Sequence, residues 1–363
     1  MKYLEEFRDA ERVRKVAAAV AAVAPADRAF TFMEVCGTHT MAVARYGLKK
    51  LLPANVRLIS GPGCPVCVTP KEYVDHAVAL AREPGVAVAT FGDMMRVPGS
   101  STDLLRLQAE GADVRVFYSA RDALAFARAE PDRRVVFLGV GFETTAPTVA
   151  ATAKEAAAAG IRNYFVLAAH KLIPPAMRAL CESGDVALDG FLCPAHVSAI
   201  IGARAYEFIP RDYGLACAVA GFEPVDILQG IYLLLKQYAD GERRVDNQYS
   251  RVVKREGNPR AQEVQAEVFD VCDSRWRGLG DLPASGLAIR DEYAALDAAR
   301  ALEVEPEETV PDHGCICGDV LTGAKVPADC PLFGDECTPA RPVGPCMVSS
   351  EGSCAAAFKF EYE

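Results

Sequence analysis

The sequence has no long apolar segment and no excess of positive charge. No apolar run in its 363 residues reaches the roughly 18–20 residues that a membrane-spanning helix needs. The 39 basic and 49 acidic residues leave a net charge of −10, which argues against a nucleic-acid-binding protein. Because 51% of the residues are hydrophobic and 24% are charged, disordered, collagen-like and coiled-coil chains are excluded. We therefore expect a globular protein that binds neither nucleic acid nor membrane.

The N-terminus does not have the pattern of a secretory signal. An alanine-rich stretch at 16–26 follows Glu5, Glu6, Asp9 and Glu11, and an acidic start is wrong for such a signal. We therefore expect the protein to be cytoplasmic. At about 100–200 residues per domain, its length predicts two or three domains.

Short apolar runs alternate with helical stretches over the first 240 residues. A helix is predicted over 3–22, and the candidate strands are 30–35, 56–60, 86–91, 114–118, 134–140, 164–168, 190–193 and 215–220. Most are separated by about 20–30 residues, the length of a βαβ unit. Continuous apolar runs such as RVVFLGVG are typical of strands buried on both faces of a parallel sheet. The pattern predicts an α/β protein with two doubly wound units, at 1–134 and 135–240.

The character of the chain changes in the third region, 241–363. Charge rises, strand patterns disappear, and cysteine, glycine and proline become frequent after residue 311. We expect this region to be helical and then rich in loops. A segment without apolar periodicity needs a metal cluster or a crosslink to hold it together.

The sequence contains 13 cysteines, an odd number that argues against a purely structural disulfide framework in a reducing compartment. Six of them lie near the C-terminus, at 315, 317, 330, 337, 346 and 354. A structural zinc site usually takes two close cysteine pairs, and only Cys315 and Cys317 are close here. An iron–sulfur cluster needs four thiolates on a flexible backbone, so it is the favoured interpretation, with zinc as the alternative. The two surplus thiols are either inert or a redox pair.

Two further thiol motifs follow predicted strands. Cys36 and His39, in CGTHT, follow the run 30–35, whereas Cys64 and Cys67, in GPGCPVC, follow 56–60. An isolated C-x-x-H pattern is more often a buried cysteine and a hydrogen-bonded histidine. The C-x-x-C motif shifts the balance toward a redox or metal site. If the two strands are neighbours, these side chains meet at one edge of the sheet, and soft thiolates suit iron, zinc or copper.

Two polar motifs complete the pattern. GFETTAP at 141–147 leaves a predicted strand and opens a helix, where its amides and hydroxyls can face an anion. It is not a P-loop, because no Gly-Lys-Ser/Thr follows. PAHVS at 194–198 likewise places a histidine just after a strand.

Taken together, CGTHT, GPGCPVCVTP, GFETTAP, PAHVS and the tail from GCICG to EGSC resemble the HypD family of hydrogenase maturation factors. The resemblance covers nearly the whole chain. It implies two related α/β domains and a third domain that holds a [4Fe–4S] cluster. It also implies a scaffold on which the Fe(CN)2CO group of [NiFe] hydrogenases is assembled, with a HypC-type small chaperone and a HypE-type cyanide donor as partners.

The resemblance also implies roles for individual residues. Cys36, Cys64 and Cys67 would be the thiols that hold the transient iron, with His39 nearby. The cluster ligands would be Cys315, Cys330, Cys337 and Cys354, which leaves Cys317 and Cys346 as a redox pair. We hypothesise an electron relay from the cluster through this pair to Cys64 and Cys67. The residues expected to carry the chemistry are therefore Cys36, His39, Cys64, Cys67, Cys317 and Cys346.

Two other functions fit parts of the pattern. A free-standing iron–sulfur thiol–disulfide reductase would use the C-x-x-C motif and the cluster, but it would not need the Cys36–His39 motif. A zinc protein without enzymatic activity would use the C-terminal cysteines alone. For the scaffold we expect ligand-transfer and redox chemistry, without turnover by the isolated protein.

Overall fold

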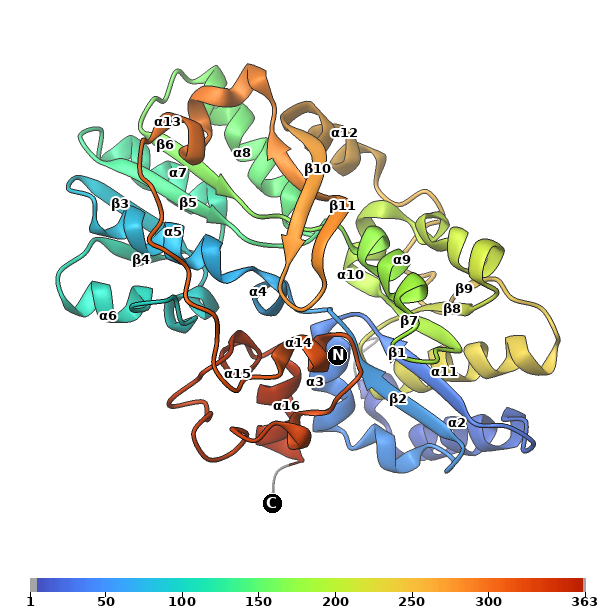
Figure 1. The fold of residues 1–363 in the computed structure, drawn as a ribbon. Helices are drawn as coiled ribbons and strands as arrows, with labels where there is room; N and C mark the ends of the chain where they lie inside the picture. The colour runs from blue at the N-terminus through green and yellow to red at the C-terminus, as the bar shows by residue number, and fades with distance from the viewer. Residues whose placement is uncertain (1–4, 362–363) are drawn as a thin grey trace.

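Residues 5–361 are described by a computed structural model, which contains two parallel β-sheets (Figure 1). Sheet A has the order β2-β1-β7-β8-β9 and sheet B the order β4-β3-β5-β6; β10 and β11 form an antiparallel hairpin. The strands are β1 Phe30–Glu34, β2 Val56–Ser60, β3 Val86–Thr90, β4 Val114–Val116, β5 Arg134–Gly139, β6 Tyr164–Ala168, β7 Gly190–Pro194, β8 Ala216–Ala220, β9 Val245–Asn247, β10 Phe269–Trp276 and β11 Gly280–Ile289.

Helices connect the parallel strands and cover the sheets, so the predicted α/β class is confirmed (Figure 1). Every residue of β3 and β8 is buried, as expected for strands covered on both faces. The α-helices are α1 Glu5–Arg8, α2 Ala10–Val23, α3 Gly37–Arg45, α4 Pro65–Val68, α5 Lys71–Arg82, α6 Leu104–Ala109, α7 Ala120–Ala129, α8 Ala146–Ala158, α9 Ile173–Ser183, α10 Ala195–Ile201, α11 Pro224–Ala239, α12 Pro259–Val268, α13 Ala298–Ala301, α14 Cys317–Leu321, α15 Pro345–Val348 and α16 Ser353–Phe360. Short 3-10 or π turns are η1 Leu48–Leu51, η2 Gly92–Arg96, η3 Ala203–Tyr206, η4 Ile209–Tyr213, η5 Asp291–Leu296 and η6 Pro327–Asp329.

The predicted division near residue 135 does not separate the two sheets. Sheet A takes β1 and β2 from the start of the chain and β7 to β9 from beyond residue 190, while sheet B is built from β3 to β6 between them. Residue 135 therefore lies in β5, inside sheet B. The reason is that strand pairing joins segments far apart in the chain, and local apolar periodicity carries no information about the partner.

The predicted N-terminal helix over 3–22 is interrupted at Asp9. This residue ends α1 and caps α2, because its carboxylate accepts a hydrogen bond from the Arg12 backbone N–H at 2.8 Å. Residues 3 and 4 lie outside the described part of the chain.

The hairpin of β10 and β11 corrects the expectation that strands are absent after residue 241. Its residues alternate between exposed and buried only irregularly, and a register shift lies between Cys272 and Ser274. Beyond it, the cysteine-rich segment forms loops and the short helices α14, α15 and α16. Figure 1 shows this segment (red) beside α3 and β2 (blue), and α16 packs against α3.

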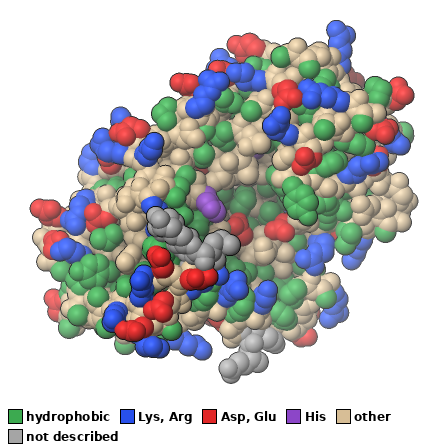
Figure 2. All heavy atoms as spheres, turned by 180° about the vertical axis from the view of Figure 1, so that it is seen from behind, with side chains coloured by type: hydrophobic (Ala, Val, Ile, Leu, Met, Phe, Trp, Pro, Cys, Tyr) green, Lys and Arg blue, Asp and Glu red, His purple; other side chains and the backbone are tan. Residues whose placement is uncertain are grey.

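Side chains of both charges are interspersed on the face of the molecule that Figure 2 presents, without a broad patch of one sign. Within residues 5–361, no helix has both the length and the apolar character that crossing a membrane requires.

Candidate functional site

The two N-terminal thiol motifs lie at the same edge of sheet A. Strands β1 and β2 are parallel neighbours, with Phe30 opposite Val56, so Cys36 and Cys64 follow adjacent strand ends. This confirms the premise that the two strands are neighbours. The Gly37 backbone N–H donates to the Gly63 carbonyl at 2.9 Å. A Cβ atom on Gly63 would overlap the backbone of Cys36, so glycine permits this close approach.

Cys64 and Cys67 form a disulfide across the first turn of α4. Cys64 precedes the helix and Pro65 occupies its first position, where a missing N–H is harmless. Both cysteines are buried. The Cys67 sulfur lies 3.9 Å from the carbonyl oxygen of Pro345, which is the residue before Cys346. The disulfide is therefore in contact with the C-terminal cysteine segment.

Cys36 stands at the N-terminus of α3 and is buried. Burial raises the pKa of the Cys36 thiol to about 12, and the nearby Glu351 carboxylate adds to this effect. The backbone N–H groups of His39 and Thr38 lower the pKa but do not outweigh burial. The thiol is therefore protonated near neutral pH. A metal that binds here must displace this proton.

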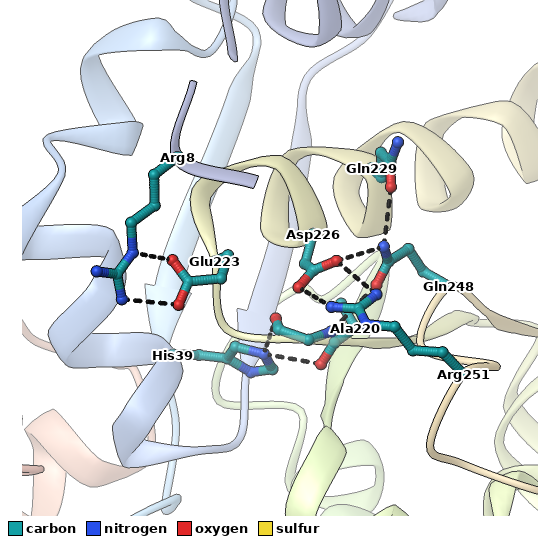
Figure 3. A network of polar contacts seen from close by, with 9 residues as sticks. Arg8, His39, Ala220, Glu223, Asp226, Gln229, Gln248 and Arg251 are labelled. Carbon is teal, nitrogen blue, oxygen red and sulfur yellow. Dashed lines mark hydrogen bonds and ion pairs between the residues drawn. The ribbon is translucent and has the colours of Figure 1, made fainter. Parts of the chain in front are cut away.

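His39 joins α3 to the loop after β8 (Figure 3). Its Nε2 lies 3.1 Å from the Ala220 carbonyl oxygen and 3.0 Å from that of Gly221. Since carbonyls only accept hydrogen bonds, Nε2 carries the proton. Burial lowers the pKa of His39 to about 4, so the ring is neutral. The Nδ1 atom is buried and has no hydrogen-bond partner among the described residues, which leaves one lone pair unused.

A buried carboxylate orders the loop that holds His39 (Figure 3). Asp226 in α11 accepts two hydrogen bonds from Arg251, at 3.0 and 2.6 Å, and one from Gln248 at 2.7 Å. The Gln248 side chain in turn accepts the Gly221 N–H at 3.1 Å. Figure 3 also shows a second pair, between Arg8 and Glu223, which is more exposed.

This contrast yields a stability prediction. Asp226→Ala is expected to lower the free energy of unfolding by about 3 kcal/mol, because it leaves Arg251 and Gln248 without their buried acceptor. Glu223→Ala is the matched control and should cost less than about 1 kcal/mol, since exposed pairs contribute little. Urea unfolding measures both. Equal losses in the two variants would contradict the prediction.

Six cysteines line one small cavity in the C-terminal segment. They are Cys315, Cys317, Cys330, Cys337, Cys346 and Cys354. Gly344 lies close to this cavity, and a Cβ atom at this position would lie only 2.8 Å from the Cys315 sulfur. The predicted cluster ligands and the predicted redox pair therefore face the same space.

Within this group, Cys317 lies between two other thiols. The hydrogen bond with Cys315 lowers the pKa of Cys317. The hydrogen bond with Cys346 and burial raise it by more, so that the pKa of Cys317 is about 12. Cys317 is thus in contact with both Cys315 and Cys346. The carbonyl oxygen of Pro345, the residue before Cys346, contacts the Cys67 sulfur. Sequence spacing alone did not reveal this contact.

The C-terminal cavity fits an iron–sulfur cluster in the chemistry of its donors, which are all thiols on a loop-rich backbone. Burial raises the pKa of Cys354, and Cys315, Cys337, Cys317 and Cys330 each add to this effect, so these groups are near neighbours. As they stand, however, no three His, Cys, Asp or Glu side chains among the described residues are arranged to hold a single metal ion.

Three residues near the site were missed by sequence reasoning. Glu34, two residues before Cys36, is buried and accepts a hydrogen bond from Thr40 at 2.5 Å; a lone acid in the apolar run FTFMEV was the available signal. Glu351 accepts from Thr38 at 2.7 Å and belongs to the EGSC motif. Arg277, in the unpredicted hairpin, donates to the Thr69 carbonyl at 3.1 Å and to Asp312 at 2.6 Å.

The GFETTAP motif contributes a buried acid. Glu143 accepts a hydrogen bond from the Ile173 backbone N–H at 2.9 Å through Oε1, while its buried Oε2 has no partner among the described residues. Burial raises the pKa of Glu143 from 4.5 to about 7. The folded protein therefore holds a proton that the unfolded chain releases between these two pH values.

The stability that this proton supplies is complete below about pH 4.5 and is lost as the pH rises through about 7. Glu143→Gln keeps an acceptor for Ile173 and removes the titration. Between about pH 5 and pH 8, the wild type should therefore lose about 1–3 kcal/mol more of its unfolding free energy than the variant does. Urea unfolding at both pH values tests this. The control is Glu242→Gln, an exposed position, and an unchanged pH dependence in Glu143→Gln would refute the assignment.

The fold and the site together define an α/β protein of two parallel sheets, with paired thiol motifs at one sheet edge beside a cysteine-lined cavity. A family model described as HypD, "Hydrogenase formation hypA family", matches residues 11–361, and the chain belongs to this family. A hydrogenase maturation factor HypD from Rhizobium leguminosarum bv. viciae is 48% identical over 98% of this chain and 94% of its own length. Those of Azotobacter vinelandii and Escherichia coli K12 are 48% and 44% identical, over 99% and 100% of this chain and 97% and 99% of their own lengths.

Proposed function

We propose that this protein acts in hydrogenase maturation as the scaffold on which the Fe(CN)2CO group is assembled. In this proposal it works with a HypC-type chaperone and receives cyanide from a HypE-type donor. One observation carries the proposal: the thiol motifs of Cys36 and Cys64–Cys67 meet at one sheet edge and touch the C-terminal cysteine segment through Pro345. Membership of the HypD family supports it.

The iron fragment is the cargo of this site. Cyanide and carbon monoxide bind electron-rich iron, and thiolates donate charge to such an ion. Cys36, Cys64 and Cys67 would be its protein ligands. While Cys64 and Cys67 form a disulfide, neither sulfur is a free thiolate, so the site opens only on their reduction.

Cys317 and Cys346 are the proposed reductant of that disulfide. In thiol–disulfide exchange, their two thiols become one disulfide while Cys64–Cys67 becomes two thiols, so two electrons and two protons are transferred. Cys315, Cys330, Cys337 and Cys354 would hold the resident [4Fe–4S] cluster, which supplies one-electron chemistry when bound. His39 would hold α3, and hence Cys36, in position.

Spectroscopy of the protein purified without oxygen, together with its HypC-type partner, tests the proposal. We expect infrared bands of bound cyanide and carbonyl, and two kinds of iron in the Mössbauer spectrum. Elemental analysis should find iron. A complex that loads iron but never shows cyanide or carbonyl bands, even with the cyanide donor present, would overturn the scaffold role.

A second candidate is a free-standing thiol–disulfide reductase, because a disulfide lies beside a further cysteine pair. Turnover of thioredoxin-type disulfide substrates without a partner would favour it. The burial of Cys64 and Cys67, at 3% and 0% exposure, argues against it, since a protein substrate could not reach either sulfur. A zinc protein is the third possibility, and zinc bound in place of iron would identify it.

A further inference from the structure

A groove of about 710 Å³ runs along β2, and none of the cysteines lines it. All five residues of β2 line one side. The opposite side comes from the C-terminal segment and includes Val326, Phe333 and Ala357. Figure 1 shows these two parts of the chain side by side. Gly323 lies where they meet, since a Cβ atom there would be 2.8 Å from the Ile59 side chain.

The free edge of a parallel sheet lines the groove. Strand β2 pairs with β1 and ends the order of sheet A. The Phe30 N–H donates to Asn55 O at 2.7 Å and the Gly61 N–H donates to Glu34 O at 2.8 Å, so the odd-numbered residues of β2 face β1. The backbone groups of Leu58 and Ser60 therefore face the groove, and none of them bonds to the backbone of another described residue. Such a row of open donors and acceptors is a template for an added strand.

The groove also carries unpaired positive charge in a protein whose net charge is −10. Arg57 and Lys325 both line it and are exposed, and neither forms an ion pair with a described residue. The third cation, Lys49, is paired with Glu361 at 3.2 Å. The groove thus retains two free cations beside its open hydrogen-bonding edge.

We propose that β2 is a docking edge for an extended acidic segment of a partner protein, which adds to sheet A as a further strand. Backbone hydrogen bonds to Leu58 and Ser60 supply the pairing, and carboxylates opposite Arg57 and Lys325 supply the selectivity. A second copy of this chain is a poor occupant, because edge-to-edge pairing would bring the same cations together. The proposal goes beyond the assembly of iron ligands and uses none of the cysteines.

The test uses the full-length protein and three synthetic, end-blocked peptides. One alternates valine and glutamate, the second has lysine in place of glutamate, and the third is the acidic peptide with proline in place of valine. Hydrogen exchange followed by mass spectrometry reports on 56–60, and fluorescence anisotropy gives the affinity. We expect the acidic peptide to bind and to slow exchange at Leu58 and Ser60. The proline peptide should do neither, because it lacks the N–H groups of a strand.

Charge reversal gives the matched comparison. Arg57→Glu with Lys325→Glu should weaken binding of the acidic peptide by about tenfold or more and improve binding of the lysine peptide. The control pair, Arg162→Glu with Lys254→Glu, changes exposed cations outside the groove and should leave both affinities unchanged. Circular dichroism establishes that each variant is folded.

Three outcomes would overturn the proposal. The first is unchanged exchange at 56–60 with millimolar acidic peptide. The second is equal binding of the acidic and the lysine peptides. The third is a concentration-dependent dimer in sedimentation that itself protects 56–60, which would make a second copy the occupant. None of these measurements involves iron or hydrogenase, so they stand independently of the proposed function.

Discussion

Replacing both Cys317 and Cys346 by serine is expected to abolish hydrogenase maturation while the absorbance of the proposed iron–sulfur cluster persists. The two thiols touch each other, and Cys346 follows the residue whose carbonyl contacts the Cys67 sulfur. In the proposed relay, Cys317 and Cys346 are the dithiol that exchanges with the Cys64–Cys67 disulfide, and the double variant lacks it. Maturation should therefore fall to the level of a strain that lacks the gene.

Alkylation of free thiols followed by mass spectrometry supplies a measurement that does not depend on hydrogenase. In the double variant, Cys64 and Cys67 should accumulate as the disulfide under conditions in which the wild type holds them reduced. Cys181→Ser with Cys272→Ser is the matched control, because it removes two other cysteines and should leave maturation and thiol state unchanged. Full maturation by the Cys317/Cys346 variant would eliminate the relay.

Cys36→Ala is expected to reduce the iron retained at the proposed scaffold site by about tenfold or more, again without loss of the proposed cluster. Cys36 is the one thiol that α3 places against the Cys64 loop, where Gly63 and Gly37 are hydrogen bonded. Iron analysis of the complex with the HypC-type partner, with the cluster contribution taken from its absorbance, measures the loss.

Cys36→Ser serves as the conservative comparison, since a hydroxyl preserves the shape of the side chain but binds soft iron poorly. Both variants should lose iron. If alanine alone does so, the defect lies in local packing. If iron loading survives both changes, Cys36 does not hold the metal.

Several features of the fold were predictable because their physical causes are local. Strands β2 and β6 were predicted with their observed bounds. In β6 the reason is a continuous hydrophobic run, YFVLA, whose first four residues are buried. The N-terminal thiol motifs were expected to meet if their strands were neighbours, and the pairing of β1 with β2 confirms that premise. The hairpin was missed because its two strands carry no regular alternation.

The candidate site depends on contacts that local patterns cannot specify. Motif spacing identified Cys64 and Cys67 as a pair, but it carried no sign that Pro345 lies against Cys67. The Nε2 atom of His39 contacts two carbonyls at the end of β8, about 180 residues further along the chain, and this leaves Nδ1 as the unprotonated nitrogen.

The residues alone determined the α/β class, the thirteen cysteines and the motifs of the HypD family, because composition, periodicity and spacing are properties of neighbouring residues. Only the tertiary structure determines how the parallel strands of residues 5–361 divide between two sheets, which cysteines touch, and which strand keeps a free edge. These depend on chain segments that meet only after folding. Their pairing is selected by burial and hydrogen bonding over the whole molecule, and no short stretch of sequence records that selection.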